Sequence, residues 1–138
     1  MLVGTDFSAP ATRALELAFE LAPTASVHVS HIWRPWPSGE PGSWTQLSGL
    51  AALERALERD ANALGAALVE TQSAAGRHIH FEAICGVSVA TQLIAQSAGF
   101  DLVALGSRGA DSDGRDLFGR TAEAVLRGVQ CSVLIASG

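Results

Sequence analysis

Three glycines near the end of the chain have the spacing of a loop that binds an anion. Gly106 is followed after two residues by Gly109, and Gly119 follows after nine more. The apolar run 102–105 precedes the first glycine, and a helix-like run, 121–127, follows the last. A strand, a glycine loop and a helix in this order direct backbone N–H groups and a helix N-terminus at an anion. Glycine also lets the backbone approach a phosphate closely, so the segment predicts a phosphate-binding loop.

The residue after the last glycine departs from what a phosphate site favours. A hydroxyl side chain would donate to a phosphate there, whereas the chain has Arg120, with Thr121 next to it. Residues 110–118 also carry three aspartates, which repel a triphosphate unless a divalent cation lies between them. Arg108, Arg115 and Arg120 offset this repulsion, because guanidinium groups pair well with phosphate. Arg120 and the aspartates therefore count against a triphosphate ligand, whereas the arginines and a divalent cation such as Mg²⁺ would offset them.

Composition predicts one globular domain over residues 1–138. The chain is 48% hydrophobic, and its length is enough to bury a core. No apolar run reaches the roughly 18 residues that a membrane span needs, and the N-terminus lacks the basic start of a signal peptide. We therefore expect a cytoplasmic protein that does not associate with membranes. The net charge of −5 argues against nucleic acid as a partner, and the absence of lysine excludes lysine-dependent phosphate loops.

Hydrophobic patterning and capping residues predict strands and helices in alternation. Ser8 and Ser88 precede two of the helical patterns as N-caps, and Pro23 ends the first of them. The expected strands cover residues 2–6, 26–32, 78–85, 100–105 and 132–136. The expected helices cover residues 9–22, 47–75, 89–99 and 119–127, the last closed by Gly128. The long second helix is expected to bury its leucines at helical spacing, Leu50, Leu53, Leu57, Leu64 and Leu68.

This alternation implies right-handed βαβ crossovers and an α/β fold. We expect a single doubly wound domain, with a five-stranded, mostly parallel sheet and helices on both of its faces. In such sheets a ligand binds at the carboxyl ends of the strands, where the winding reverses. Asp6, Ile32 and Gly106 fall at such strand ends.

Two segments carry a resemblance to a known family. The chain has Val-Gly-Thr-Asp-Phe-Ser at 3–8 and Leu-Gly-Ser-Arg-Gly at 105–109, and with these it resembles the universal stress protein family over essentially its whole length. Nucleotide-binding members carry Gly-x2-Gly-x9-Gly followed by Ser or Thr, and Gly106, Gly109 and Gly119 match that spacing. The resemblance implies a five-stranded doubly wound fold, a homodimer and, in many members, ATP binding.

The resemblance also implies roles for individual residues. Asp6 would contact the adenosine, Ile32 and Leu105 would flank the base, and the glycine loop would hold the phosphates. Asp6 has an alternative structural role, as the cap of the helix that begins near Ser8. The candidate nucleotide-binding residues are Thr5, Asp6, Ile32, Leu105, Gly106, Ser107, Arg108, Gly109, Gly119, Arg120 and Thr121.

Three functions remain open from the sequence. In the first, a cytoplasmic homodimer binds ATP or a related adenine nucleotide with little or no hydrolysis, because no general base is evident. In the second, the loop with Arg120 has lost nucleotide binding, and a dimer surface at strand 133–136 mediates protein interactions. In the third, on fold analogy alone, the protein is an enzyme acting on adenine nucleotides. No serine lies in a recognisable catalytic triad, so we expect no enzymatic function beyond slow incidental hydrolysis.

The histidines favour structural roles. His28 and His31 are three apart on one strand and therefore face opposite sides of it. His78 and His80 share a face, but no set of acids or cysteines near them in the sequence suits zinc. We expect no metal site formed by histidine.

Cysteines and tryptophans also favour packing. Cys85 and Cys131 lie in or beside strand-like segments, so we expect small buried residues with free thiols. Trp33, Trp36 and Trp44 lie in or beside the proline-rich segment 33–46. Packing or a dimer contact is the expected role of these indoles, and a lid over the ligand is the alternative.

Overall fold

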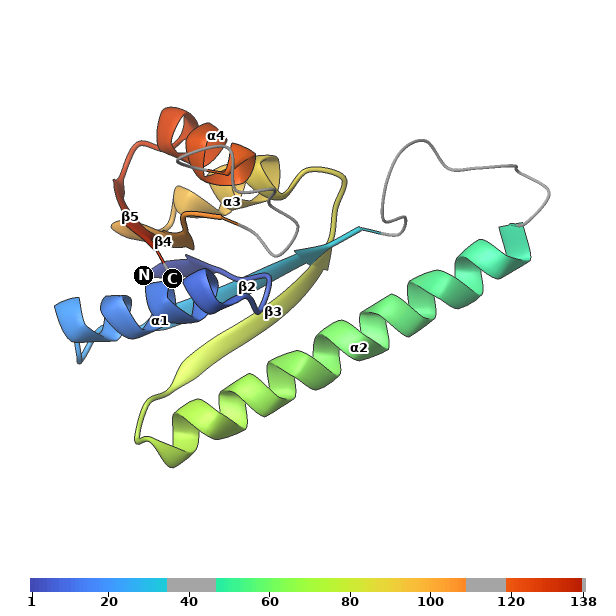
Figure 1. Ribbon diagram of the computed structural model, residues 1–138, viewed down its shortest axis with the longest axis horizontal. Helices are drawn as coiled ribbons and strands as arrows, with labels where there is room; N and C mark the ends of the chain where they lie inside the picture. The colour runs from blue at the N-terminus through green and yellow to red at the C-terminus, as the bar shows by residue number, and fades with distance from the viewer. Residues whose placement is uncertain (35–46, 109–118, 138) are drawn as a thin grey trace.

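Strands and helices alternate along the computed structural model (Figure 1), which describes residues 1–34, 47–108 and 119–137. The strands are β1 (Leu2–Gly4), β2 (Val27–Trp33), β3 (Ile79–Cys85), β4 (Leu102–Gly106) and β5 (Ser132–Ala136). The helices are α1 (Ala9–Leu21), α2 (Leu47–Ala74), α3 (Val89–Ser97) and α4 (Arg120–Gly128). None of the described helices is long and apolar enough to cross a membrane.

The five strands form one sheet in the order β3-β2-β1-β4-β5. Every neighbouring pair is parallel, so all the carboxyl ends lie along one edge of the sheet. The chain adds β2 and β3 on one side of β1 and then returns to add β4 and β5 on the other side. The winding therefore reverses between β1 and β4, and the predicted doubly wound α/β fold is confirmed.

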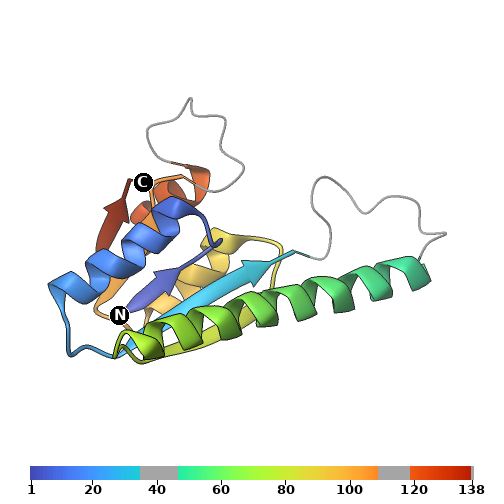
Figure 2. The same cartoon turned by 60° about the horizontal axis from the view of Figure 1, so that its bottom comes forward.

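Helices cover both faces of the sheet (Figures 1 and 2), with α1 and α2 on one face and α3 and α4 on the other. Successive residues of a strand point to opposite faces, and β1 shows this alternation. Val3 is fully buried with Ala14 and Ala18 of α1. Leu2, its neighbour, is buried with Leu93 of α3 in a second cluster. The sheet thus has an apolar core on each side, as burial of a parallel sheet requires.

Helix α2 packs on the sheet mainly through small residues, and only some of its predicted leucines are exposed. Leu53 and Leu64 are 41% and 49% exposed, so the expectation that they are buried is wrong. Ala61 is 3% exposed, and Gly65 is buried against the ring of Phe81 in β3. These small residues let the helix lie close to β3. Leu53 and Leu64 are exposed, whereas Leu68 packs against the core as expected. Both views show α2 continuing past the carboxyl ends of β2 and β3 (Figures 1 and 2).

Several element ends differ from the sequence-based expectation by one or two residues. Strand β1 ends at Gly4 rather than at Asp6, because the chain turns directly after Thr5. Strand β2 includes Trp33, and β4 begins at Leu102 rather than at Phe100. Each shift moves a residue between the strand and its adjoining turn, and the order of elements is unchanged.

The last helix also ends later than expected. Gly128 is its final residue and does not cap it, since the C-cap is Val129, whose N–H donates to the carbonyl of Val125. The side chain of Ile94 in α3 lies where a Cβ of Gly128 would be. Contact between α3 and α4 therefore explains this glycine better than helix termination does.

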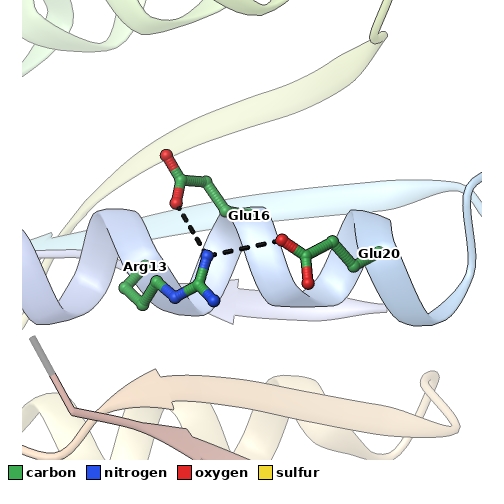
Figure 3. Close-up of polar contacts among 3 residues, drawn as sticks. All are labelled: Arg13, Glu16 and Glu20. Atoms are coloured by element: carbon green, nitrogen blue, oxygen red, sulfur yellow. Dashed lines mark hydrogen bonds and ion pairs between the residues drawn. The ribbon is translucent and has the colours of Figure 1, made fainter.

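The outer face of α1 carries exposed ion pairs (Figure 3). Arg13 lies 3.2 Å from the carboxylate of Glu16 and 3.3 Å from that of Glu20. All three side chains are more than two-fifths exposed, and exposed pairs of this kind contribute about 0–1 kcal/mol each. These charges mark the solvated side of α1, and the fold depends on its buried side.

The close packing of α2 on β3 predicts that Gly65→Ala destabilises the protein. A Cβ at this position would overlap the Phe81 ring, and overpacking of a buried contact costs about 1–3 kcal/mol. Chemical denaturation measures the change in the free energy of unfolding. Gly99→Ala is the matched control, because no atom lies within 4 Å of its added Cβ, and we expect it to change stability by less than about 0.5 kcal/mol. Equal effects of the two substitutions would contradict the packing argument.

Candidate functional site

The turn between β1 and α1 is held by a series of short-range hydrogen bonds. The N–H of Thr5 donates to the carbonyl of Ser30 in β2 over 2.9 Å. The N–H of Phe7 then donates to Oγ1 of Thr5, and the N–H of Ser8 donates to Oδ1 of Asp6, each over 3.0 Å. Side-chain acceptors two residues upstream are typical of tight polar turns. The turn is therefore built by the same two polar residues that the sequence predicts for the ligand site.

Ser8 begins helix α1, as predicted. Its Oγ accepts a hydrogen bond from the N–H of Ala11 over 3.4 Å, and its carbonyl accepts from the N–H of Thr12. Asp6 is therefore not the N-cap, and that alternative is wrong. Its carboxylate is exposed at the carboxyl end of β1 and accepts from the N–H of Ser8.

The end of β4 lies directly against the first turn of α1. A Cβ added to Gly106 would come within 2.8 Å of the backbone N of Ala11 and of two atoms of Pro10. Real Cβ atoms almost never approach backbone atoms so closely, so glycine is required here by packing alone. This contact brings the first residue of the glycine motif next to the turn that carries Asp6.

The segments after β4 and before α4 are joined at Ser107. Its N–H donates to the carbonyl of Ala136 at the end of β5 over 2.6 Å, and its carbonyl accepts from the N–H of Gly119 over 2.5 Å. Ser107 is itself buried. The two ends of the predicted phosphate loop are thus tied together, while Gly109 and the spacer 110–118 lie outside the described residues.

Helix α4 begins without a side-chain cap. Gly119 is its N-cap and offers no side-chain acceptor, so only the backbone bond from Glu123 to the Gly119 carbonyl closes the first turn. Arg120 is exposed and Thr121 is partly buried. Neither Arg108 nor Arg120 forms an ion pair with another of the described residues. The N–H groups of the first turn and these two cations are the groups here that favour an anion.

Most of the predicted site residues lie at the carboxyl edge of the sheet, where the winding reverses. Thr5 and Asp6 follow β1, Gly106 ends β4 with Ser107 and Arg108 behind it, and α4 starts beside Ser107. Ile32 and Leu105 differ from these, since their side chains are only 7% and 4% exposed. Both belong to the core beneath α3, and their proposed place beside a nucleotide base stays a prediction.

His31 and Phe7 belong to this region, although neither is among the predicted site residues. Nδ1 of His31 lies 2.8 Å from the carbonyl oxygen of Thr5. Phe7 has a positive φ of 62°, and its ring lies 4.8 Å from that of His31 and 6.1 Å from that of Phe81. The sequence does hold a signal for His31, because this histidine directly precedes Ile32, a predicted site residue at a strand end. No sequence signal distinguishes the backbone conformation of Phe7.

The other histidine of β2 faces the opposite side of the sheet, as predicted. The ring of His28 lies 4.6 Å from that of His80 and 5.1 Å from that of Phe100. Among the described residues, no group of three or more histidines, cysteines and acids is arranged to hold a metal ion. A Mg²⁺ ion that binds together with nucleotide stays a prediction.

Cys85 is exposed at the end of β3, so the expectation that it is buried is wrong, and Cys131 is only partly buried. Both thiols are free. Partial desolvation, together with the negative charges of Glu54 and Glu58 on α2, raises the pKa of the Cys85 thiol. A raised pKa lowers the fraction of reactive thiolate at neutral pH, which argues against Cys85 as a nucleophile.

Comparison with known proteins identifies the family. The sequence matches the profile described as the universal stress protein family over residues 1–137. The chain belongs to the universal stress protein family. No protein of curated function matches the sequence significantly.

Solved structures of other universal stress proteins share its fold. UspA from Lactobacillus plantarum has 20% sequence identity and a TM-score of 0.82, and the match covers 98% of this chain and 94% of that one. A universal stress protein in complex with cAMP has 22% identity and a TM-score of 0.59, with coverage of 98% and 94%. One from Archaeoglobus fulgidus in complex with dAMP has 17% identity and a TM-score of 0.59, also with coverage of 98% and 94%. At these identities the likeness establishes the fold of this universal stress protein.

The environment of Cys85 predicts slow alkylation. Desolvation and the nearby carboxylates raise the pKa of the Cys85 thiol. At neutral pH a raised pKa leaves a smaller fraction of the reactive thiolate. We expect iodoacetamide to modify Cys85 more slowly near neutral pH than it modifies an unstructured cysteine peptide. Glu54→Gln removes a negative charge, lowers the pKa and raises the rate. Glu70→Gln, on the same helix but not among the causes of this shift, is the control, and peptide mass spectrometry separates Cys85 from Cys131. A rate that is unchanged by Glu54→Gln would contradict the electrostatic cause.

Proposed function

We propose that this universal stress protein is a cytoplasmic, homodimeric regulatory module that binds ATP or a related adenine nucleotide at the carboxyl edge of its sheet. One observation carries the proposal. The turn with Asp6, the close approach of Gly106 to α1, and the glycine-capped start of α4 meet at the reversal of winding between β1 and β4. Open α/β sheets bind their ligands at this point.

The chemistry of the loop suits phosphate groups. The first turn of α4 has N–H groups without a side-chain cap, and such groups together with the helix dipole favour an anion. Arg120 stands where nucleotide-binding relatives have a hydroxyl. Its guanidinium carries several N–H donors and a full positive charge, so it is able to replace the single hydrogen bond of a hydroxyl.

The chemistry of the β1 turn suits the adenosine half of the ligand. A carboxylate oxygen accepts more than one hydrogen bond, and Asp6 is exposed at the end of β1. Sugar hydroxyls are donors that a carboxylate at a strand end is suited to bind. Two related universal stress proteins were solved with the adenine nucleotides cAMP and dAMP, which supports the proposed ligand class. We expect little or no hydrolysis, because we assign no general base to this site.

A second function is favoured by the sheet edge. Strand β5 is a terminal strand of the sheet, and Val133, Leu134 and Ile135 are only partly buried. An edge strand offers unpaired backbone groups to another chain. If Arg120 has ended nucleotide binding, the protein would act through this edge as a dimeric interaction protein.

A calorimetric titration of nucleotide-free protein with ATP, with and without Mg²⁺, tests the first function. We expect saturable binding of about one ATP per chain. Asp6→Asn keeps an acceptor for the Ser8 N–H but removes the charge, and loss of a charged hydrogen bond should weaken binding about tenfold. Gly119→Val should weaken it further by placing a side chain at the start of α4.

Asp101→Asn is the matched control, since Asp101 is exposed just before β4, at the amino end of that strand. It removes the same charge, and we expect no change in affinity. Absence of saturable heat up to millimolar ATP would reject nucleotide binding and leave the interaction function. Equal effects of Asp6→Asn and Asp101→Asn would reject the role of Asp6.

Sedimentation velocity at micromolar concentrations tests the dimer. We expect the wild-type protein to sediment as a dimer and Val133→Lys to sediment as a monomer, because a charge on an edge strand opposes edge-to-edge pairing. Glu82→Lys introduces lysine at an exposed position of the other terminal strand, β3, and should leave the dimer intact. A dimer that persists in Val133→Lys but dissociates in Glu82→Lys would move the interface to β3.

A further inference from the structure

The carbonyl of Thr5 is held by a side chain from the neighbouring strand. Thr5 is the residue before Asp6, and β2 contacts both of its backbone polar groups. Its N–H donates to the Ser30 carbonyl over 2.9 Å, and its carbonyl lies 2.8 Å from Nδ1 of His31. The second contact is a hydrogen bond when Nδ1 carries the proton, since a carbonyl oxygen only accepts. Two consecutive residues of β2 thus hold the two peptide groups on either side of the Thr5 Cα, where the chain leaves the sheet.

The ring of His31 also supports the residue that follows Asp6. Phe7 has a backbone conformation with a φ of 62°, which is unfavourable for a residue with a side chain. Such a conformation persists where the surrounding structure holds it. The Phe7 ring packs 4.8 Å from His31 and 6.1 Å from Phe81, in a tilted arrangement typical of aromatic pairs. His31 therefore contacts the turn on both sides of Asp6.

These contacts determine where the Asp6 carboxylate lies. A peptide group is planar, so fixing the Thr5 carbonyl also fixes the direction of the Asp6 N–H. The N–H of the next peptide, that of Phe7, donates to Oγ1 of Thr5, and the bond from Ser8 N–H to Oδ1 holds the carboxylate itself. Loss of any of these contacts would let the Asp6 carboxylate move relative to Gly106, which packs against the first turn of α1.

We infer that His31 is a positioning residue for the nucleotide site, acting on Asp6 through the Thr5 carbonyl and the Phe7 ring. The inference rests on the proposed function for its effect on ligand affinity. Its effect on the turn is a property of the nucleotide-free protein and is measured separately. His31 does not need to touch the nucleotide.

A pair of variants isolates the hydrogen bond. His31→Asn places an amide N–H donor at the δ position, where Nδ1 stands, whereas His31→Leu has a similar shape and no donor. Both variants lose the aromatic ring, so their difference reports the hydrogen bond. His28→Leu removes the other histidine of β2, which faces the opposite side of the sheet, and serves as the control.

Amide hydrogen exchange in the nucleotide-free protein is the first readout. We expect His31→Leu to exchange the N–H groups of Phe7 and Ser8 about tenfold faster than His31→Asn does, the size of effect of one hydrogen bond. The N–H groups of β4 and α2 should exchange at equal rates in the two variants. ATP affinity should fall by a similar factor in His31→Leu relative to His31→Asn, and His28→Leu should change neither quantity.

The imidazole nitrogens of the wild-type protein provide a readout that needs no variant. Nitrogen NMR distinguishes the two neutral tautomers, and we expect Nδ1 of His31 to carry the proton. An unprotonated Nδ1 would overturn the inference, and so would equal exchange rates in His31→Asn and His31→Leu. If the wild-type protein does not bind ATP but these rates differ as expected, the proposed function fails while the positioning of the turn by His31 stands.

Discussion

The close approach of β4 to α1 at Gly106 is the contact on which the candidate site depends. Since a Cβ there would lie 2.8 Å from backbone atoms of Pro10 and Ala11, the two elements reach this separation only with glycine. The contact brings the end of β4 to the first turn of α1, and Ser107 then connects this point to β5 and α4. A glycine of the phosphate-loop motif is thus also a packing residue, so its presence alone does not establish phosphate binding.

The order of elements could be predicted from the sequence because it depends on local patterns. Ser8 and Ser88 accept from the first-turn amides of their helices, as short polar side chains before a helical pattern indicate. The central strands β1 and β4 are short apolar runs that are mostly buried, and their alternation with helices is typical of a parallel sheet. Most strand ends differ from the prediction by one or two residues. A strand ends where backbone groups find partners other than the neighbouring strand's backbone, as the Thr5 carbonyl does with the side chain of His31.

The remaining errors concern contacts that only the folded chain creates. The leucines of α2 have the correct helical spacing, yet Leu53 and Leu64 are exposed. Gly65 is buried instead, because the Phe81 ring of β3 occupies the space where a larger side chain would lie. Asp6 was identified as a site candidate, but its supports were not, since His31 is 26 residues from Thr5 and the turn conformation of Phe7 has no local signature. Local sequence therefore predicts the residues of a site better than it predicts the contacts that position those residues.

The charges at the carboxyl edge of the sheet would orient the proposed nucleotide. A cation in the first turn of a helix opposes the helix dipole, at a cost of about 0.3–1 kcal/mol, and Arg120 stands at the first position of α4 with only a glycine before it. An anion bound there would offset this repulsion, because it is attracted to both the guanidinium and the amides. The carboxylate of Asp6 lies across the reversal of winding and would repel the same anion, while it accepts hydrogen bonds from hydroxyl groups. A ligand with a phosphate at one end and a sugar at the other satisfies both charges in a single orientation, and a simple anion satisfies only one of them.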